Sequence, residues 1–286
     1  MSNSIKEILN KPLVMLDGAM GTMLMKSGVE IGKYPEVLCF THTDLIENIH
    51  KQYVDAGADI IYTNTFGANR KKLTGSGYSC ADIIKEAVKI AKNAAHGTET
   101  KVALSIGSIG ELLKPIGTLE HDEAYDILKE MVIAGEEADL VVFETMMDLN
   151  EVKAGVLAAK ENTSLPVFAS MTYEKTGRTF MGCTIESMAG TLEELGVDAV
   201  GINCSLGPKA IFPLAEKLVG CTKLPVFIKA NAGLPDPETG QYNVSAEEFA
   251  LQMKEYAKIG IKIMGGCCGT SPEYIKLMKN LMSKND

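Results

Sequence analysis

Residues 101–144 read KVALSIGSIGELLKPIGTLEHDEAYDILKEMVIAGEEADLVVFE. An apolar run at 101–106 is followed by an amphipathic stretch of helix length at 121–134 and by a second apolar run at 140–144. Short apolar runs that end in polar residues are typical of buried strands, whereas apolar residues three and four positions apart are typical of a helix packed on one face. The stretch therefore predicts a strand, a crossover helix and a second strand parallel to the first.

The same unit recurs along the whole chain. We expect strands at 13–17, 59–63, 101–106, 140–144, 167–172, 199–203, 226–231 and 262–265. We expect helices at 42–56, 79–95, 121–134, 148–161, 185–195, 208–219, 245–258 and 272–283. Strict alternation predicts an α/β fold with parallel strands, and eight units in 286 residues predict one (β/α)8 TIM barrel domain over residues 1–286.

The alternative to a barrel is an open, doubly wound sheet. That fold often carries a glycine-rich dinucleotide loop after its first strand. Asp17-Gly18-Ala19-Met20-Gly21-Thr22 has the wrong glycine spacing for such a loop. We therefore favour the barrel, in which these glycines let the backbone approach a small ligand.

Composition excludes several classes of partner. The net charge is -9, with 37 acidic and 28 basic residues, which gives no electrostatic footprint for nucleic acid or for an anionic membrane. The chain begins without a signal peptide and has no apolar run of membrane-spanning length, so we expect a cytoplasmic protein. Seven cysteines in a reducing compartment are expected to be thiols or metal ligands. Four of them have no grouping that indicates chemistry, and we expect packing or surface thiols at Cys39, Cys80, Cys183 and Cys221.

The other three cysteines follow two of the predicted strands. Cys204 comes after the strand at 199–203, and Cys267 and Cys268 come after the strand at 262–265. Active sites of these barrels lie at the carboxyl ends of the strands, so the three thiols are expected to converge. Three thiolates suit zinc with its fourth position open, which is a catalytic arrangement. The alternatives are small apolar residues in a tight turn, or a redox pair at 267 and 268 that would need no third thiol.

Six motifs, in order along nearly the whole chain, resemble the homocysteine S-methyltransferase family. They are Leu16-Asp17-Gly18-Ala19-Met20-Gly21-Thr22, Thr63-Asn64-Thr65-Phe66, Phe143-Glu144-Thr145, Gly201-Ile202-Asn203-Cys204, Asn231-Ala232-Gly233 and Gly265-Gly266-Cys267-Cys268-Gly269-Thr270. Within the family, residues 64–70 are most similar to the homocysteine-binding barrel of cobalamin-dependent methionine synthase. They are less similar to the betaine-dependent and S-methylmethionine-dependent branches.

The resemblance implies that Cys204, Cys267 and Cys268 are catalytic zinc ligands and that the thiolate of L-homocysteine takes the fourth place. A zinc-bound thiol is deprotonated at neutral pH, whereas a free thiol is mostly protonated. Three cysteine thiolates on a dication leave a formal charge of -1, so a fourth thiolate is held loosely and stays nucleophilic. A helix that starts near Ser271 should further favour the thiolate forms of the neighbouring cysteines.

The amino-acid end of homocysteine needs its own contacts. We expect Asp17 and Glu144 to accept hydrogen bonds from the ammonium, and the backbone of the loop at Gly18 and Ala19 to bind the carboxylate. Asp17 has the alternative role of a cap or turn residue. The resemblance implies that Asn231 occupies the open metal position before substrate arrives, although a loop cap would explain it almost as simply.

The methyl donor must come from outside, because the sequence ends about where the barrel ends. We therefore expect no attached corrinoid or folate module, and a methylcorrinoid on a separate protein as donor. The alternatives are a module of a longer methionine synthase, another donor such as S-methylmethionine or betaine, and a non-catalytic zinc- or thiol-binding module that docks to a partner. The histidines, at positions 42, 50, 96 and 121, have no ligand spacing, and we expect them to be solvated or capping.

Overall fold

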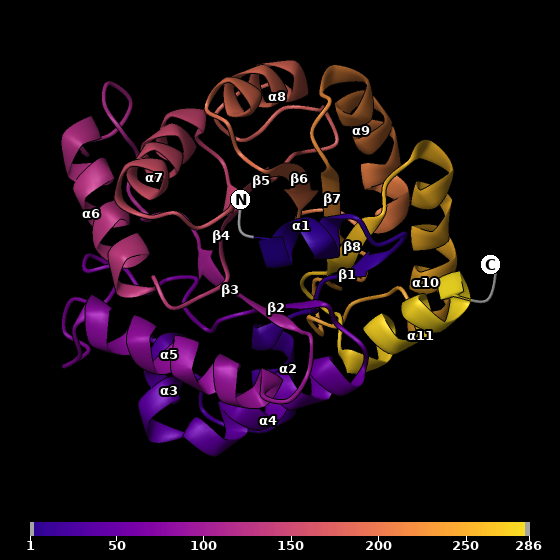
Figure 1. The fold of residues 1–286 in the computed structure, drawn as a ribbon, viewed down its shortest axis with the longest axis horizontal. Coiled ribbons are helices and arrows are strands. Elements are labelled where there is room, and N and C mark those ends of the chain that lie inside the picture. Colours follow the sequence, from indigo (N-terminus) through magenta and orange to yellow (C-terminus); the bar gives the residue numbers. More distant parts are fainter. Residues whose placement is uncertain (1–2, 284–286) are drawn as a thin grey trace.

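The computed structural model describes residues 3–283, which form a barrel of eight parallel strands ringed by helices (Figure 1). The strands are β1 (Val14–Met15), β2 (Ile60–Tyr62), β3 (Lys101–Ile106), β4 (Leu140–Met146), β5 (Val167–Met171), β6 (Ala199–Asn203), β7 (Val226–Ala230) and β8 (Ile263–Gly266). Their order is β1-β8-β7-β6-β5-β4-β3-β2, and a parallel bridge between Leu16 and Ile60 joins the two end strands. The predicted (β/α)8 barrel is confirmed, and the open sheet is excluded.

The crossover helices lie where the periodicity placed them. They are α4 (Thr43–Asp55), α5 (Cys80–Ala95), α6 (His121–Ala134), α7 (Leu149–Asn162), α8 (Ile185–Glu194), α9 (Pro208–Cys221), α10 (Ala246–Lys254) and α11 (Pro272–Ser283). The stretch after α10 tightens into a 3-10 helix, η2 (Glu255–Ile259), before Gly260 ends it with a positive φ of 85°. Among residues 3–283, no helix combines the length and the apolar character needed to cross a membrane.

Four short helical segments were not predicted from the sequence. They are α1 (Asn3–Leu9), α2 (Met20–Lys26), η1 (Pro35–Val37) and α3 (Leu38–Thr41). The α1 helix lies across the amino-terminal end of the barrel, over its centre in Figure 1. Its Ile5 and Ile8 side chains pack in one apolar cluster with inward-facing strand residues such as Ile60 and Leu140. This helix therefore closes the end of the barrel opposite to the carboxyl ends of the strands.

One expectation about the surface was wrong. His50 was expected to be solvated or capping, but it is fully buried on the inner face of α4 with Ile46, Ile49 and Tyr53. Both of its ring nitrogens lack a hydrogen-bond partner within the described part of the chain. Burial lowers the pKa of His50 to about 4, so the ring is neutral at pH 7.

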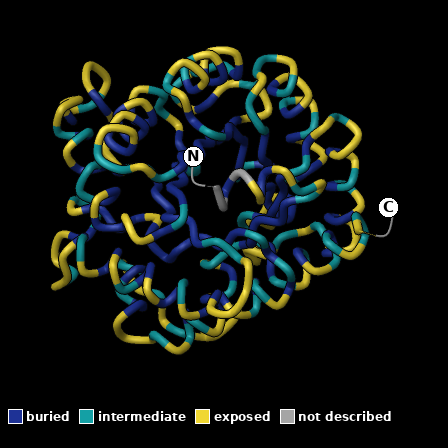
Figure 2. The backbone as a smooth tube through the Cα atoms, in the orientation of Figure 1, coloured by how far each residue is buried: buried dark blue, intermediate teal, exposed yellow. Residues whose placement is uncertain are grey.

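The barrel interior changes from apolar to polar toward the carboxyl ends of the strands. Inward-facing Ala103, Val142, Phe168 and Phe227 belong to the apolar inner cluster. Two residues further along their strands, the side-chain alternation brings in polar residues, which are Ser105, Glu144, Ser170 and Lys229. Figure 2 shows the buried backbone concentrated in the central strands, with exposed segments around the outside. A polar layer therefore lies above the apolar core, at the carboxyl ends of the strands, where an active site of this architecture is expected.

Candidate metal centre

The three cysteines predicted to converge do so at the carboxyl ends of β6 and β8. The Sγ atoms of Cys204, Cys267 and Cys268 all lie within 4.8 Å of one another, and all three residues are partly buried. The Sγ atoms of Cys204 and Cys268 are 3.9 Å apart. In a tetrahedral zinc site with bonds of about 2.3 Å, the sulfurs are separated by about 3.8 Å. The arrangement of the sulfurs fits a zinc ion, with one corner left for another ligand.

Burial and mutual hydrogen bonds shift the pKa values of the clustered thiols in opposite directions. Hydrogen bonds with the Cys204 and Cys267 thiols lower the pKa of Cys268 to about 3, against the opposing effect of burial. The same hydrogen bonds, with burial, raise the pKa of Cys267. A dication bound among the three sulfurs would favour the thiolate form of each cysteine.

Residues near the sulfurs adopt unusual backbone conformations with positive φ, which set the directions of their side chains. Within residues 3–283, the residues other than glycine with positive φ are Thr145 (59°), Cys204 (63°) and Ser205 (58°), all at the ends of β4 and β6. Each such conformation costs about 1–3 kcal/mol and persists only where surrounding contacts fix it. Here the Cys204 N–H donates to the Lys229 carbonyl (3.0 Å), and the Ser205 and Thr172 hydroxyls are hydrogen-bonded to each other.

Asn203 links the two strained turns. Its Oδ1 accepts from the Thr145 N–H and from the Ser170 hydroxyl, both at 2.8 Å, and its Nδ2 donates to the Thr145 hydroxyl at 2.7 Å. These contacts fix the orientation of the amide, and they place Nδ2 at 4.0 Å from the Cys267 Sγ. Asn203 could support the metal site or could be a plain turn residue at the end of a strand, and its contacts favour support of the site.

Hydrogen bonds to the neighbouring strand β7, to the loop after it and within the turn itself hold the turn that carries Cys267 and Cys268. The Cys267 N–H donates to the Ala230 carbonyl (2.7 Å), and the Cys268 carbonyl accepts from the Ala232 N–H (2.9 Å). The Thr270 hydroxyl donates to the Cys267 carbonyl (2.7 Å), and α11 begins two residues later. The expected helix start beside these cysteines is therefore present, and neighbouring strands hold the sulfurs in place.

Asp17 lies at the site but its carboxylate is already occupied. Its Oδ1 is 2.5 Å from the Lys229 Nζ, its Oδ2 accepts from the Tyr62 N–H at 2.6 Å, and both charged side chains are 4% exposed. Burial raises the pKa of Asp17, and the charge of Lys229 opposes that rise. For Lys229, burial lowers the pKa, but the charges of Asp17 and Glu144 outweigh it and raise the pKa overall. We expect an ion pair, which leaves Asp17 little capacity to bind a second cation.

Lys229 lies at the candidate site but was not predicted from the sequence. It occupies an inward position of β7, and its Nζ also lies 3.5 Å from the centre of the Tyr62 ring. The available signal was a lysine inside an otherwise apolar strand, because a charged residue there must find a partner or pay a large desolvation cost.

Glu144 is the carboxylate that remains available. Only its Oε1 is hydrogen-bonded within residues 3–283, to the Ser105 hydroxyl at 2.6 Å. Burial raises the pKa of Glu144, while the charge of Lys229 and the Ser105 hydrogen bond lower it. A cationic group brought beside Glu144 would favour its ionised form.

Gly18 and Ala19 pack tightly against the turn after β8. A Cβ on Gly18 would lie 2.7 Å from the Thr270 hydroxyl oxygen and 2.8 Å from that of Tyr53, so only glycine fits. The Ala19 N–H donates to the Thr270 hydroxyl (3.3 Å), and its carbonyl accepts from Tyr53 (3.1 Å). Both residues therefore set the shape of the loop that leads into α2. A role in binding a carboxylate stays a prediction.

Asn231 has a side-chain oxygen without a partner. Its N–H donates to the Leu206 carbonyl (3.0 Å), the residue is 4% exposed, and its Oδ1 has no hydrogen-bond partner in residues 3–283. A buried oxygen without a partner, one residue before the Ala232 N–H that binds the Cys268 carbonyl, suits a ligand better than it suits a loop cap.

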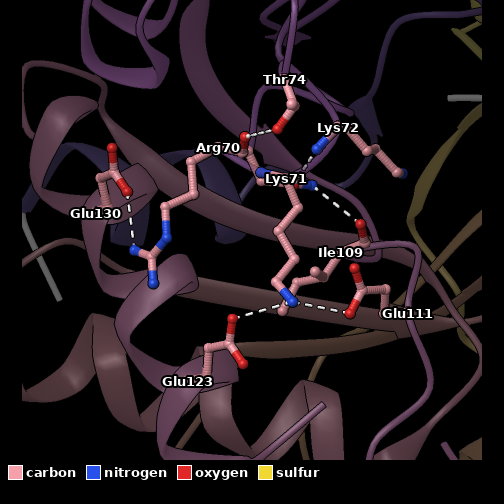
Figure 3. Close-up of polar contacts among 9 residues, drawn as sticks. Arg70, Lys71, Lys72, Thr74, Ile109, Glu111, Glu123 and Glu130 are labelled. Atoms are coloured by element: carbon pink, nitrogen blue, oxygen red, sulfur yellow. Dashed lines mark hydrogen bonds and ion pairs between the residues drawn. The ribbon is translucent and has the colours of Figure 1, made fainter. Parts of the chain in front are cut away.

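Ion pairs fasten the loop that follows β2 to its neighbours (Figure 3). Arg70 pairs with Glu130 of α6 at 3.0 Å, and Lys71 pairs with Glu111 at 2.8 Å and Glu123 at 3.0 Å. Exposed pairs are individually weak, but several in one place restrain a loop. These basic side chains are neutralised, so they present no free positive surface at this edge of the barrel.

Comparisons with known proteins identify the family of this chain. The family model described as homocysteine S-methyltransferase matches residues 14–282. The methionine synthase of Mycobacterium tuberculosis is 33% identical over 94% of this chain, and that of Mycobacterium leprae is 31% identical over 94%. The chain spans 24% of the length of either relative.

Solved structures share the fold. The metallated form of the homocysteine methyltransferase MmuM from Escherichia coli superposes with a TM-score of 0.84 at 22% identity, covering 97% of this chain and 100% of that one. The oxidized form gives a TM-score of 0.83 at 20% identity, with coverage of 98% and 100%.

Proposed function

Because this chain belongs to the homocysteine S-methyltransferase family and is a methyltransferase, we propose that it methylates the sulfur of L-homocysteine with the help of a zinc ion. Cys204, Cys267 and Cys268 would hold the metal. The observation that carries the proposal is the set of three sulfurs within 4.8 Å of one another at the carboxyl ends of the strands. A bound zinc ion would keep the substrate thiol deprotonated, and so nucleophilic, at neutral pH.

The chain's own residues would orient the substrate. Glu144 is proposed to accept hydrogen bonds from the ammonium, because one of its oxygens is free and because burial raises its pKa, so that an ammonium beside it would further favour its ionised form. Lys229 neutralises Asp17 and so leaves this role mainly to Glu144. The unpartnered Oδ1 of Asn231 supports a place for it beside the sulfurs, where it would bind the metal until substrate displaces it.

The donor is proposed to be a methylcorrinoid carried by a protein. Apolar side chains on loops after three neighbouring strands support a protein-borne donor. Phe180 is 71% exposed, Ile116 69% and Met147 39%, and they follow β5, β3 and β4. The two relatives, both methionine synthases, are about fourfold longer than this chain, which also supports a donor carried by a protein. We further propose that residues 1–286 form one barrel without a corrinoid or folate module.

Metal content and X-ray absorption at the zinc edge test the proposal. We expect about one zinc per chain, bound by three sulfurs and one lighter atom, and a change to four sulfurs when L-homocysteine is added. Four sulfurs before substrate, or no bound metal, would contradict catalysis at zinc. Methyl transfer assays with methylcorrinoid protein, S-methylmethionine and betaine then identify the donor.

A further inference from the structure

Tyr62 carries a buried hydroxyl that has no partner. The residue is 5% exposed at the end of β2, and its Oη makes no hydrogen bond within residues 3–283. Other buried tyrosines are satisfied, since the hydroxyls of Tyr53, Tyr173 and Tyr256 donate to the carbonyls of Ala19, Thr184 and Pro208. An unsatisfied buried hydroxyl destabilises the folded state, so an exception at a candidate site points to a ligand.

The surroundings of Tyr62 place its hydroxyl among the groups of the site. Its backbone N–H binds Asp17, and its ring lies under the Lys229 ammonium at 3.5 Å from the ring centre. Burial raises the pKa of Tyr62, and the negative charges of Glu144 and Asp17 raise it further. The hydroxyl is therefore within reach of the charges of both carboxylates.

A cation is the group that best fits beside this hydroxyl. The fixed charges that act on Tyr62 are negative apart from Lys229, which is already bound to Asp17. An anionic end of the substrate would meet repulsion there, whereas an ammonium could donate both to Glu144 and to the lone pairs of the Tyr62 oxygen.

We propose that the Tyr62 hydroxyl is a substrate-binding group that accepts a hydrogen bond from the ammonium of the amino thiol, beside Glu144. This inference rests on the proposed function, because it takes homocysteine as the substrate. It adds a recognition element for the amino group that the three cysteines, which contact only sulfur, do not supply.

The test compares Tyr62→Phe with Tyr256→Phe in the zinc-loaded protein. Tyr256 is a matched control because it is fully buried and its hydroxyl is satisfied, 2.5 Å from the Pro208 carbonyl. Dissociation constants are measured by calorimetry for L-homocysteine and for 4-mercaptobutanoate, which lacks the amino group. Urea unfolding of both variants without substrate gives a second readout.

For Tyr62→Phe we expect homocysteine binding to weaken about 10-fold or more, because a hydrogen bond to a charged group is lost. Binding of 4-mercaptobutanoate should be unchanged, and the unfolding midpoint should stay the same or rise. For Tyr256→Phe we expect a lower midpoint and unchanged binding of both thiols.

Two results would overturn the inference while leaving the proposed function in place. One is an equal loss of affinity for both thiols, and the other is unchanged homocysteine binding by Tyr62→Phe, whatever its unfolding midpoint. If the wild-type protein binds no homocysteine, the proposed function fails, and this inference fails with it.

Discussion

Replacing Lys229 by methionine removes the positive charge that faces the Asp17 carboxylate inside the barrel. The two charged side chains are each 4% exposed and 2.5 Å apart, so water cannot take the place of the lost ammonium. Removing one member of a buried ion pair costs about 3–5 kcal/mol, because the other charge is left without compensation. Against a typical unfolding free energy of about 5–15 kcal/mol, this loss should be large.

The loss should depend on pH with a definite sign. Without Lys229, burial dominates and the pKa of Asp17 rises further above its unfolded value, because the lysine charge is what opposes that rise. A carboxyl group whose pKa is raised in the folded state binds a proton more readily there than in the unfolded chain. The deficit of Lys229→Met relative to wild type should therefore shrink as the pH falls from 8 toward 5.

Urea unfolding followed by circular dichroism measures the effect, and a double-mutant cycle isolates the pair. Asp17→Asn combined with Lys229→Met should be more stable than Lys229→Met alone, because the Asp17 carboxylate is then removed together with its partner. If Lys229→Met alone does not fold, folding of the double variant still tests the argument. A single variant within about 0.5 kcal/mol of wild type, or a double variant no better than the single one, would refute the ion-pair reasoning.

Three further predictions follow from the site and its surroundings. Cys204→Ser should lose zinc and methyl transfer while keeping its circular dichroism spectrum; retention of full activity would contradict the metal assignment. His50→Leu should flatten the dependence of the unfolding free energy on pH. The pKa of His50 is about 4 in the folded protein, below the ordinary 6.5, so the unfolded chain takes up a proton first as the pH falls. The unfolding free energy of the wild type should therefore fall by about 2 kcal/mol between pH 7 and pH 5. Equal slopes of unfolding free energy against pH for the two proteins would show that His50 is not the buried group at work. Phe180→Asp should lower kcat/KM for a methylcorrinoid protein at least tenfold more than for free methylcobalamin; equal effects on both donors would argue against docking at this loop.

The fold could be read from the sequence because its main signals are local and repeated. The strand at 101–106 and the helix at 121–134 have the same limits in the structure as in the sequence pattern. The short α1 and α2 helices were not predicted, because each has only seven residues. In addition, Ala19, the N-cap of α2, offers no side-chain hydrogen bond that would mark the start of a helix. Seven residues give too few turns for a periodicity to be recognised.

The site was predictable only where topology fixes it. Strand ends in a parallel barrel lie on one side, so the convergence of the three cysteines followed from their positions after two strands. Asp17 and Lys229 form a pair although they are 212 positions apart in the sequence. Strand periodicity predicts that Lys229 points into the barrel, but it does not predict which residue it contacts there. His50 was misjudged for a different reason, because its residue type was given more weight than its position: it lies four residues after Ile46 and three before Tyr53, so helix periodicity places it on the inner face.

The helix across the amino-terminal end of the barrel has a kinetic consequence. With Ile5 and Ile8 packed into that end, both reactants must reach the sulfurs from the opposite side. If a protein-borne donor covers that side, homocysteine must bind first, and methionine can leave only after the donor has withdrawn. We therefore expect ordered steady-state kinetics, with methionine inhibiting competitively against homocysteine and not against the donor.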